Sequence, residues 1–148
     1  MLISTDSKAP GTWHVAARMP SFFEKDCVNS FAVYSLTEDP KVIGVKNVCD
    51  DVENPGEQIE VTGTAEVQDE GNSKLKVKLN RFPGNLVAGN LWVIHLDEEN
   101  YNWVIVSEPK GRYLWIMGRE EVMDENLLAD LISWVKADGW DTSALIMD

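Results

Sequence analysis

The chain has 148 residues, of which 44% are hydrophobic and 26% are charged, and its formal net charge is −12. This length predicts one domain with a core of its own, and the composition is that of a globular protein rather than a disordered chain. The acidic balance repels the phosphates of nucleic acids, so we expect no nucleic-acid partner. No apolar run approaches the roughly 20 residues of a membrane-spanning helix.

Alternation of apolar and polar residues with a period of two runs through most of the chain. The segment 58–67 shows it strictly, with Ile59 and Val61 on one face and Glu60 on the other. Turns rich in Asp, Asn, Pro and Gly separate such segments, and residues 83–89 are expected to form a loop. The expected strands span residues 11–18, 28–36, 42–49, 58–67, 73–80, 91–97, 101–108 and 113–119.

The period changes after the last expected strand. Leu128, Leu131, Ile132 and Val135 follow the spacing of an amphipathic helix. We expect a helix from about residue 124 to 138, with Asp124 as N-cap, followed by an extended tail over 143–147. The predicted fold is all-β: one domain over 1–148, in which an antiparallel up-and-down barrel of eight strands (about 11–119) carries the C-terminal helix on its outside.

The interior of such a barrel holds one small ligand only if its inward side chains leave room. Ala17, Ala32, Gly63 and Ala65 are small and are expected to point inward, and the rest of the wall is apolar or aromatic. A filled barrel without a ligand remains an alternative. The residues expected to form the ligand-binding wall are Ala32, Tyr34, Val45, Val61, Leu75, Val77, Val93, His95, Trp103, Tyr113, Trp115 and Met117.

Three motifs in chain order resemble those of the lipocalin family, in its branch of bacterial outer-membrane lipocalins and apolipoprotein D. Gly11-Thr12-Trp13 opens the first strand, Asp97 and Tyr101 lie in a late turn, and Arg119 closes the last strand. The resemblance runs from about residue 11 to 146. It implies non-catalytic transport of a small hydrophobic ligand such as a fatty acid or a lysophospholipid, with no cofactor.

The motif residues have a structural role in this interpretation. Barrel closure brings the first and last strands together, so Arg119 can lie over the indole of Trp13 as a cation–π pair. Gly11, Trp13, Asp97, Tyr101 and Arg119 are therefore expected to support the fold rather than contact the ligand. The family often has Tyr-Glu after the signature Trp, whereas this chain has His14-Val15. This departure changes one outward and one inward position, so we expect a different ligand choice.

The polar end of the ligand is expected at the mouth of the barrel. The mouth loops are expected over 19–25, which carries Phe22 and Phe23, and over 81–89. Arg18, Lys25 and Arg81 are candidates to meet a carboxylate or phosphate head. Peripheral membrane association is a further expectation. A homodimer is also expected, because the strand around 91–96 is apolar on both faces and would need to be covered.

The two cysteines flank the first expected hairpin, whose turn centres near Asp39. Stepping back from that turn places Cys27 about opposite Cys49, which favours a disulfide and an oxidising compartment. Two free thiols in a reducing cytosol are the alternative. The resemblance implies a periplasmic or cell-envelope protein, but residues 1–6 show no signal-peptide pattern and no lipidated cysteine is seen, so a cytoplasmic location also stays open.

No metal-binding or catalytic pattern stands out in the sequence. His14 and His95 are the only histidines, and their spacing with the cysteines fits no zinc site. No nucleophile elbow or phosphate-binding loop is present. We therefore expect no enzyme, no metal and no cofactor, with one alternative: a tetrapyrrole protein that binds haem or bilin, or a bilin lyase, in which an inward His95 is the candidate haem ligand.

Overall fold

The computed structural model describes residues 10–20, 27–68, 74–81 and 85–147. These residues form nine strands, one α-helix and one 3-10 helix. The strands are β1 (Gly11–Arg18), β2 (Cys27–Leu36), β3 (Val42–Asp51), β4 (Gln58–Val67), β5 (Lys74–Arg81), β6 (Asn85–Leu96), β7 (Trp103–Ser107), β8 (Leu114–Gly118) and β9 (Ile146–Met147). The helices are α1 (Glu125–Ala137) and the short 3-10 helix η1 (Thr142–Ala144).

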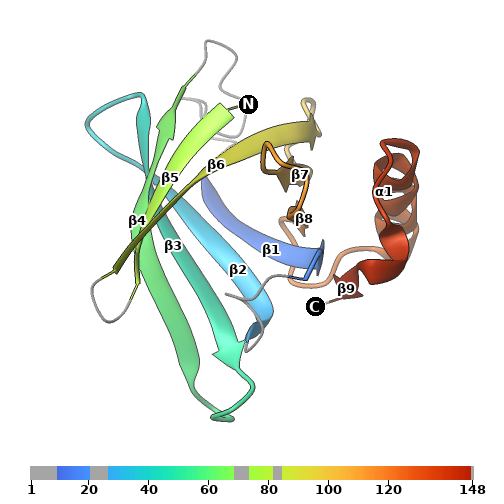
Figure 1. The fold of residues 1–148 in the computed structure, drawn as a ribbon, viewed down its shortest axis with the longest axis horizontal. Coiled ribbons are helices and arrows are strands. Elements are labelled where there is room, and N and C mark those ends of the chain that lie inside the picture. Colours follow the sequence, from blue (N-terminus) through green and yellow to red (C-terminus); the bar gives the residue numbers. More distant parts are fainter. Residues whose placement is uncertain (1–9, 21–26, 69–73, 82–84, 148) are drawn as a thin grey trace.

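The strands form one antiparallel sheet that closes on itself. Each strand from β2 to β7 pairs with the strand that follows it, β8 pairs with β1, and β1 also pairs with β2. This closure confirms the predicted barrel of eight strands, in which β1 to β8 curve around a common interior (Figure 1). The ninth strand lies outside the ring and pairs with the end of β1 through Ala17–Met147 and Arg18–Ile146.

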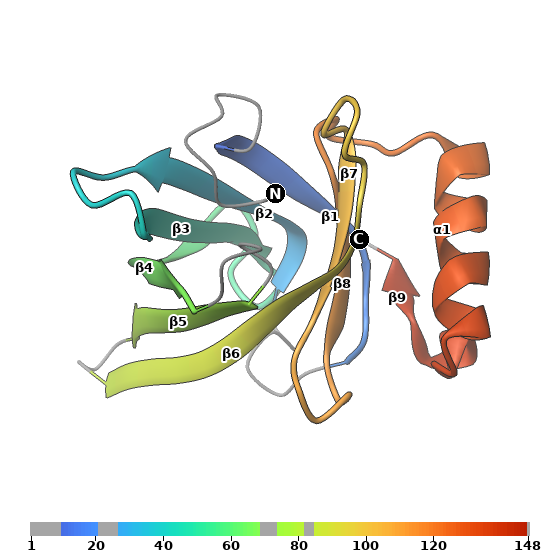
Figure 2. The same ribbon diagram turned by 90° about the horizontal axis from the view of Figure 1, so that it is seen from above.

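Apolar side chains gather in two layers, one on each face of the sheet. The inner layer lines the barrel interior and includes Trp13, Tyr34 and Val104. The outer layer lies under α1 and includes Ile105, Leu131 and Val135. Figure 2 shows α1 standing beside the barrel, with β9 between the helix and β1.

Most expected elements are present, with shifted ends. Residues 85–89, which are expected from the sequence to lie in a loop, are part of β6 instead. Asp124 is the N-cap residue of α1, but its side chain makes no capping hydrogen bond. The doubly apolar strand that suggested a homodimer has its outer residue Ile94 packed in the layer under α1, so the helix covers this position.

Two β-bulges decide which side chains point inward. In β1 the pairing with β8 shifts between Val15 and Ala17, and in β6 the pairing with β7 shifts between Val93 and His95. A bulge inserts one extra residue and reverses the alternation beyond it. The prediction that Ala17 faces inward is therefore wrong, because Ala17 is fully buried in the outer layer.

Candidate ligand-binding interior

One end of the barrel is closed by the contact between β1 and the residue that follows β8. The guanidinium of Arg119 lies 3.7 Å from the ring centroid of Trp13, which is fully buried. Arg119 Nε donates to the carbonyl of Tyr101 at 3.0 Å, and Nη1 contacts the carbonyls of Pro10 and Thr12 at 3.2 Å each. Burial lowers the pKa of Arg119 from its ordinary value.

The turn between β6 and β7 supports this closed end. The carboxylate of Asp97 accepts from the backbone N–H groups of Asn100 and Asn102, both at 3.2 Å. This holds Tyr101 in a left-handed conformation with φ of 53°, which is uncommon for a residue other than glycine. The carbonyl of Tyr101 thereby faces Arg119. The role of Asp97 and Tyr101 in supporting the fold rather than contacting the ligand stays a prediction, and these contacts support it.

The structure brings most of the expected wall residues into the barrel interior. Ala32, Tyr34, Val45, Leu75 and Met117 are buried in the inner layer, and Val77, Val93 and Trp115 pack against it half-buried. Val61 is half-buried and pairs with Asn47. Asn47 lies two positions from the inward Val45 on β3, so Val61 is on the inward face of β4. Burial raises the pKa of the Tyr34 hydroxyl to about 12, which reflects how apolar its surroundings are.

Two expected wall residues lie on the other face of the sheet. His95 Nε2 is 2.7 Å from the carboxylate of Asp138, and the His95 ring is 5.9 Å from that of Trp134. The β6 bulge turns His95 outward, so the expectation that it faces the interior is wrong, and the haem hypothesis loses its candidate ligand. Trp103 also faces α1, with its ring 5.4 Å from Trp134, because Val104 and Val106 take the inward positions of β7.

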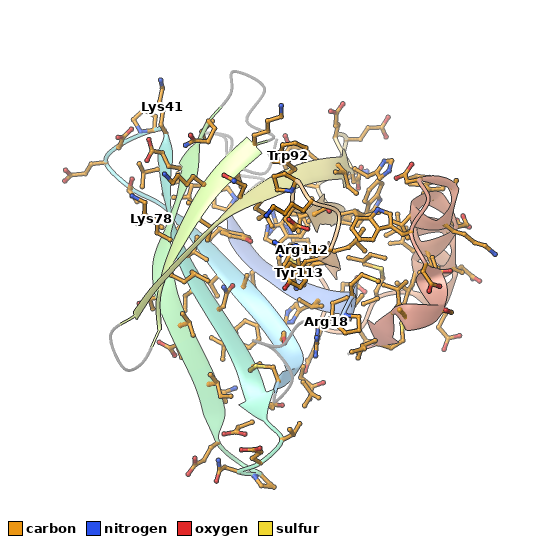
Figure 3. All side chains as sticks on the ribbon, in the orientation of Figure 1. Arg18, Lys41, Lys78, Trp92, Arg112 and Tyr113 are labelled. Carbon is orange, nitrogen blue, oxygen red and sulfur yellow. A yellow bond between two sulfur atoms is a disulfide. The ribbon has the colours of Figure 1, made fainter. Side chains whose placement is uncertain are left out.

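The mouth is the end of the barrel at which β1 ends and β2 begins. Arg18, only 3% exposed, pairs across strands with the inward Trp115, and its Nη2 donates to the Cys27 carbonyl at 3.3 Å. The rings of Tyr113 and Trp115 lie 6.2 Å apart, and the Arg112 guanidinium lies 5.2 Å above Tyr113. Figure 3 shows Arg112 and Tyr113 together near the middle of the view, with Arg18 beside the end of β1.

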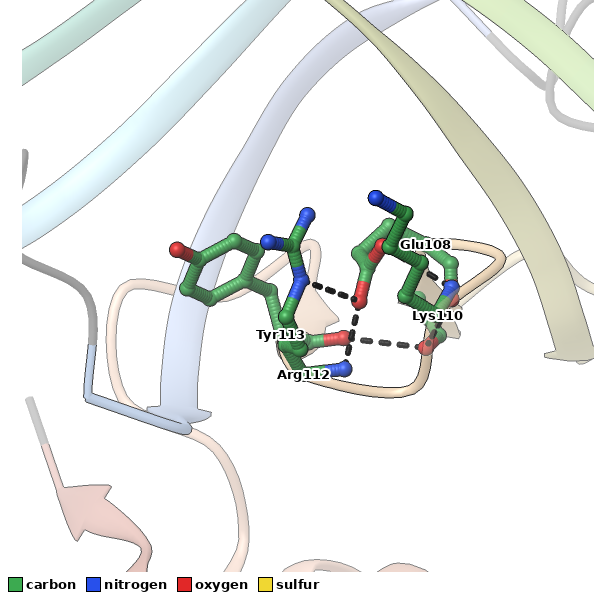
Figure 4. Close-up of polar contacts among 5 residues, drawn as sticks. Glu108, Lys110, Arg112 and Tyr113 are labelled. Atoms are coloured by element: carbon green, nitrogen blue, oxygen red, sulfur yellow. Dashed lines mark hydrogen bonds and ion pairs between the residues drawn. The ribbon is translucent and has the colours of Figure 1, made fainter.

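The turn from β7 to β8 fixes Arg112 at this mouth. The carboxylate of Glu108 accepts from the backbone N–H groups of Lys110, at 3.0 Å, and Arg112, and its ion pair with Arg112 Nε spans 3.6 Å (Figure 4). Burial opposes the ionisation of Glu108, but these N–H donors and the guanidinium outweigh it and lower the pKa of the carboxyl. Ser107 Oγ donates to the carbonyl of Tyr113 at 2.9 Å.

The predicted mouth residues lie mostly outside what the structure describes. Phe22, Phe23 and Lys25 are outside the described residues, and Arg81 is the last residue of β5, without a described side chain. The interior also holds residues that the prediction of the wall did not include. Ile43, Val104 and Val106 are almost completely buried there, and the alternation with Val45 was the signal that could have found Ile43.

A disulfide joins Cys27 and Cys49, with their Cα atoms 5.3 Å apart. The predicted bond is confirmed, although the register is different from the one expected. Cys27 pairs with Asp51 rather than Cys49, because Leu36 pairs with Ile43 and a bulge lies between Val28 and Phe31. The bond therefore runs diagonally across β2 and β3 at the mouth.

The described residues contain no group of three or more His, Cys, Asp or Glu side chains placed to hold a metal ion. Within the same part of the chain, no helix has the length and apolar character required to span a bilayer. The features of this site are therefore an apolar and aromatic interior, one closed end and a mouth lined in part by arginine. Together they define a barrel protein suited to a small ligand with an apolar body.

Comparisons with known proteins identify the family. Residues 7–148 match the model of the lipocalin-like domain, and the chain belongs to the lipocalins, which bind small hydrophobic ligands. It is 31% identical over 138 residues to the outer membrane lipoprotein Blc of Vibrio cholerae, covering 92% of this chain and 77% of that protein. It is 28% identical over 141 residues to temperature-induced lipocalin-1 of Arabidopsis thaliana, covering 91% of this chain and 73% of the relative.

A solved structure agrees with the fold. Lobster apocrustacyanin A1 superposes with a TM-score of 0.73 and 15% identity, covering 97% of this chain and 78% of that one. At this identity the similarity supports the barrel alone.

Proposed function

We propose that this lipocalin is a non-catalytic carrier of a single-chain lipid, either a fatty acid or a lysophospholipid. The observation that carries the proposal is the inward face of the sheet, on which Trp13, Val45 and Val77 are apolar, together with the buried cation Arg18 at the mouth. The apolar residues of this face suit the acyl chain of a lipid, and Arg18 suits its anionic head.

The energetics favour such a ligand. Each methylene of an acyl chain that leaves water contributes about 0.8 kcal/mol, which offsets the cost of immobilising the ligand. A carboxylate or phosphate beside Arg18 would form charge-assisted hydrogen bonds, which are shorter and stronger than neutral ones. The acyl chain would then extend from the mouth toward the closed end, past Val77 and Leu75.

Location is inferred from two observations. The Cys27–Cys49 disulfide is typical of an oxidising compartment, and the relative from Vibrio cholerae is named an outer membrane lipoprotein. We therefore propose that this chain works in the cell envelope. Thiol titration of protein isolated from its own host, under denaturing and non-reducing conditions, tests this: we expect no free thiol, and two free thiols would contradict it.

Binding of a fluorescent fatty acid tests the proposed function. With 11-(dansylamino)undecanoic acid, we expect saturable binding to the wild type and loss of at least tenfold in affinity in Val77→Trp, because the indole occupies ligand space. Lys76→Trp is the matched control, since Lys76 is the neighbouring residue on β5 and is exposed on the outside. Native mass spectrometry of the purified protein, followed by lipid extraction, identifies the bound lipid.

Two results would contradict the proposal. One is the absence of any binding by a wild-type protein that melts cooperatively. The other is equal binding by Val77→Trp and Lys76→Trp when both variants keep the wild-type melting temperature, which would place the fatty acid outside the barrel.

A further inference from the structure

A hollow lies on the outer side of the barrel, where β1 and β2 separate. Their pairing ends at His14 and Phe31, and farther along β1 the partner is β9 instead. In β2 a bulge follows Val28, and Asn29 adopts a left-handed conformation with φ of 52°. Between the separated strands the surface is hollowed by about 340 Å³, near the lower limit for small-molecule sites.

The base of this hollow is aromatic and apolar. The rings of His14 and Phe31 lie 5.6 Å apart with a tilt of 47°, and Met123 and Leu128 reach it from the side of α1. At the rim, Val122 is 80% exposed and Met147 is 54% exposed. Exposed apolar side chains around an aromatic base are characteristic of a surface that binds a ligand or partner.

The charge of the hollow has one sign. Asp50 and Glu121 contribute carboxylates, and none of the described residues that line it is a lysine or an arginine. Asn29 Nδ2 donates to Asp50 Oδ2 at 2.9 Å, and Gln58 Nε2 lies 3.5 Å from Asp50 Oδ1. These neutral amides orient the Asp50 carboxylate without neutralising it, so its negative charge remains available to a ligand.

We propose that this hollow is a second binding site, for a small organic cation with an aromatic or alkyl body. The ammonium group would lie between Asp50 and Glu121, and the apolar body would pack on Phe31 and His14. Aromatic faces attract cations as well as apolar groups, which suits both parts of such a ligand. The side chains of His14 and Phe31 alternate with the inward Trp13 and Ala32, so the aromatic base of this site lies on the opposite face of the sheet from the barrel interior.

Isothermal titration calorimetry at low ionic strength with 4-phenylbutylamine tests the site. The neutral analogue 4-phenylbutanol is expected to bind at least about tenfold more weakly, because it lacks the ammonium charge. Asp50→Asn and Glu121→Gln are each expected to weaken the amine by about three- to fivefold, the range for an exposed ion pair. Glu66→Gln removes the same charge from the exposed face of β4 and is expected to leave the affinity unchanged.

The amine and the interior ligand are expected to bind together, so saturation with 11-(dansylamino)undecanoic acid should not displace the amine. Displacement would overturn the proposal, because it would place the amine in the barrel. Equal weakening by Glu66→Gln and by Asp50→Asn would also overturn it, since the attraction would then come from the overall charge. So would equal binding of the amine and the alcohol, or no binding of either. The displacement test rests on the proposed function, whereas the comparisons with Glu66→Gln and with 4-phenylbutanol do not depend on whether the interior carries a lipid.

Discussion

The guanidinium of Arg119 lies 3.7 Å from the ring centroid of Trp13 and contacts three backbone carbonyls, on Tyr101, Pro10 and Thr12. One side chain thus ties the end of β8 to the beginning of β1 and to the turn before β7. Gly11 lies against the same group: its φ is +113°, and a Cβ there would be 3.4 Å from Arg119 Nη1. The closed end depends on these contacts, and they lie away from the mouth.

Arg119→Ala is expected to lower the free energy of unfolding by about 2–4 kcal/mol, because it removes a cation–π contact and several hydrogen bonds. Thermal melting measures this loss. Arg119→Lys keeps the charge but not the forked geometry, so its melting temperature should lie between those of the wild type and Arg119→Ala. Affinity for a fatty acid should change much less. Glu120→Ala is the neighbouring exposed control. Unchanged melting with lost binding would instead assign Arg119 to the ligand site.

Arg18→Gln is expected to weaken oleate by about tenfold while leaving oleyl alcohol nearly unchanged, because only the carboxylate uses the charge. Displacement of a fluorescent fatty acid measures both ligands. Lys78→Gln removes one positive charge from the outer wall and serves as control, since Lys78 is exposed there. If Arg18→Gln weakens oleate and oleyl alcohol equally, Arg18 acts through the fold of the mouth rather than through the ligand head.

Sequence alternation located the strands and most of the wall, and the errors have identifiable causes. Ala17 and His95 were both assigned inward, and each follows a bulge that reverses the alternation. Alternation alone does not reveal a bulge, because the extra residues, Ala16 and Ile94, are apolar like the residues that precede them. Trp103 begins an uninterrupted apolar run in β7, in which no polar residue marks the outer face. The helix that covers this face makes such a run stable.

The disulfide shows a related limit. Cys27 and Cys49 were predicted to bond because a symmetrical hairpin would place them opposite each other. The actual register differs by two residues, and the bond forms because diagonal neighbours on adjacent strands also lie within reach. Spacing therefore predicted the bond but not the pairing of the strands. The hollow between β1 and β2 had no sequence signal, since it depends on where these two strands separate.

Gly63→Ala is expected to lower the free energy of unfolding by about 1–3 kcal/mol, because β4 and β5 approach closely at this position. A Cβ on Gly63 would lie 1.9 Å from the carbonyl oxygen of Lys78 and 2.8 Å from Leu79 Cα, and both are backbone atoms. Gly89→Ala is the matched control, since a Cβ there meets nothing within 4 Å. Urea denaturation measures both variants. Equal free energies of unfolding for Gly63→Ala and Gly89→Ala would show that β5 can move away from the added methyl group without a loss of stability.

Tyr34 should make the fold sensitive to alkali. Its pKa is about 12 in the folded protein because of burial, against about 10 when the chain is unfolded. Between these values the unfolded state releases the proton and the folded state retains it, so the contribution of Tyr34 is fully present below pH 10 and is lost as the pH rises to about 12. Above that pH, the free energy of unfolding is expected to be lower by about 3 kcal/mol because of Tyr34.

Urea denaturation at pH 8, 10 and 11 measures this effect in the wild type and in Tyr34→Phe. The variant lacks the ionisable hydroxyl, so its free energy of unfolding should fall less between pH 10 and pH 11 than that of the wild type. Tyr101 and Tyr113 are present in both proteins, and their titration cancels in the comparison. Parallel curves for the two proteins would mean that the Tyr34 hydroxyl ionises as readily in the folded chain as in the unfolded one, and that water reaches this part of the interior.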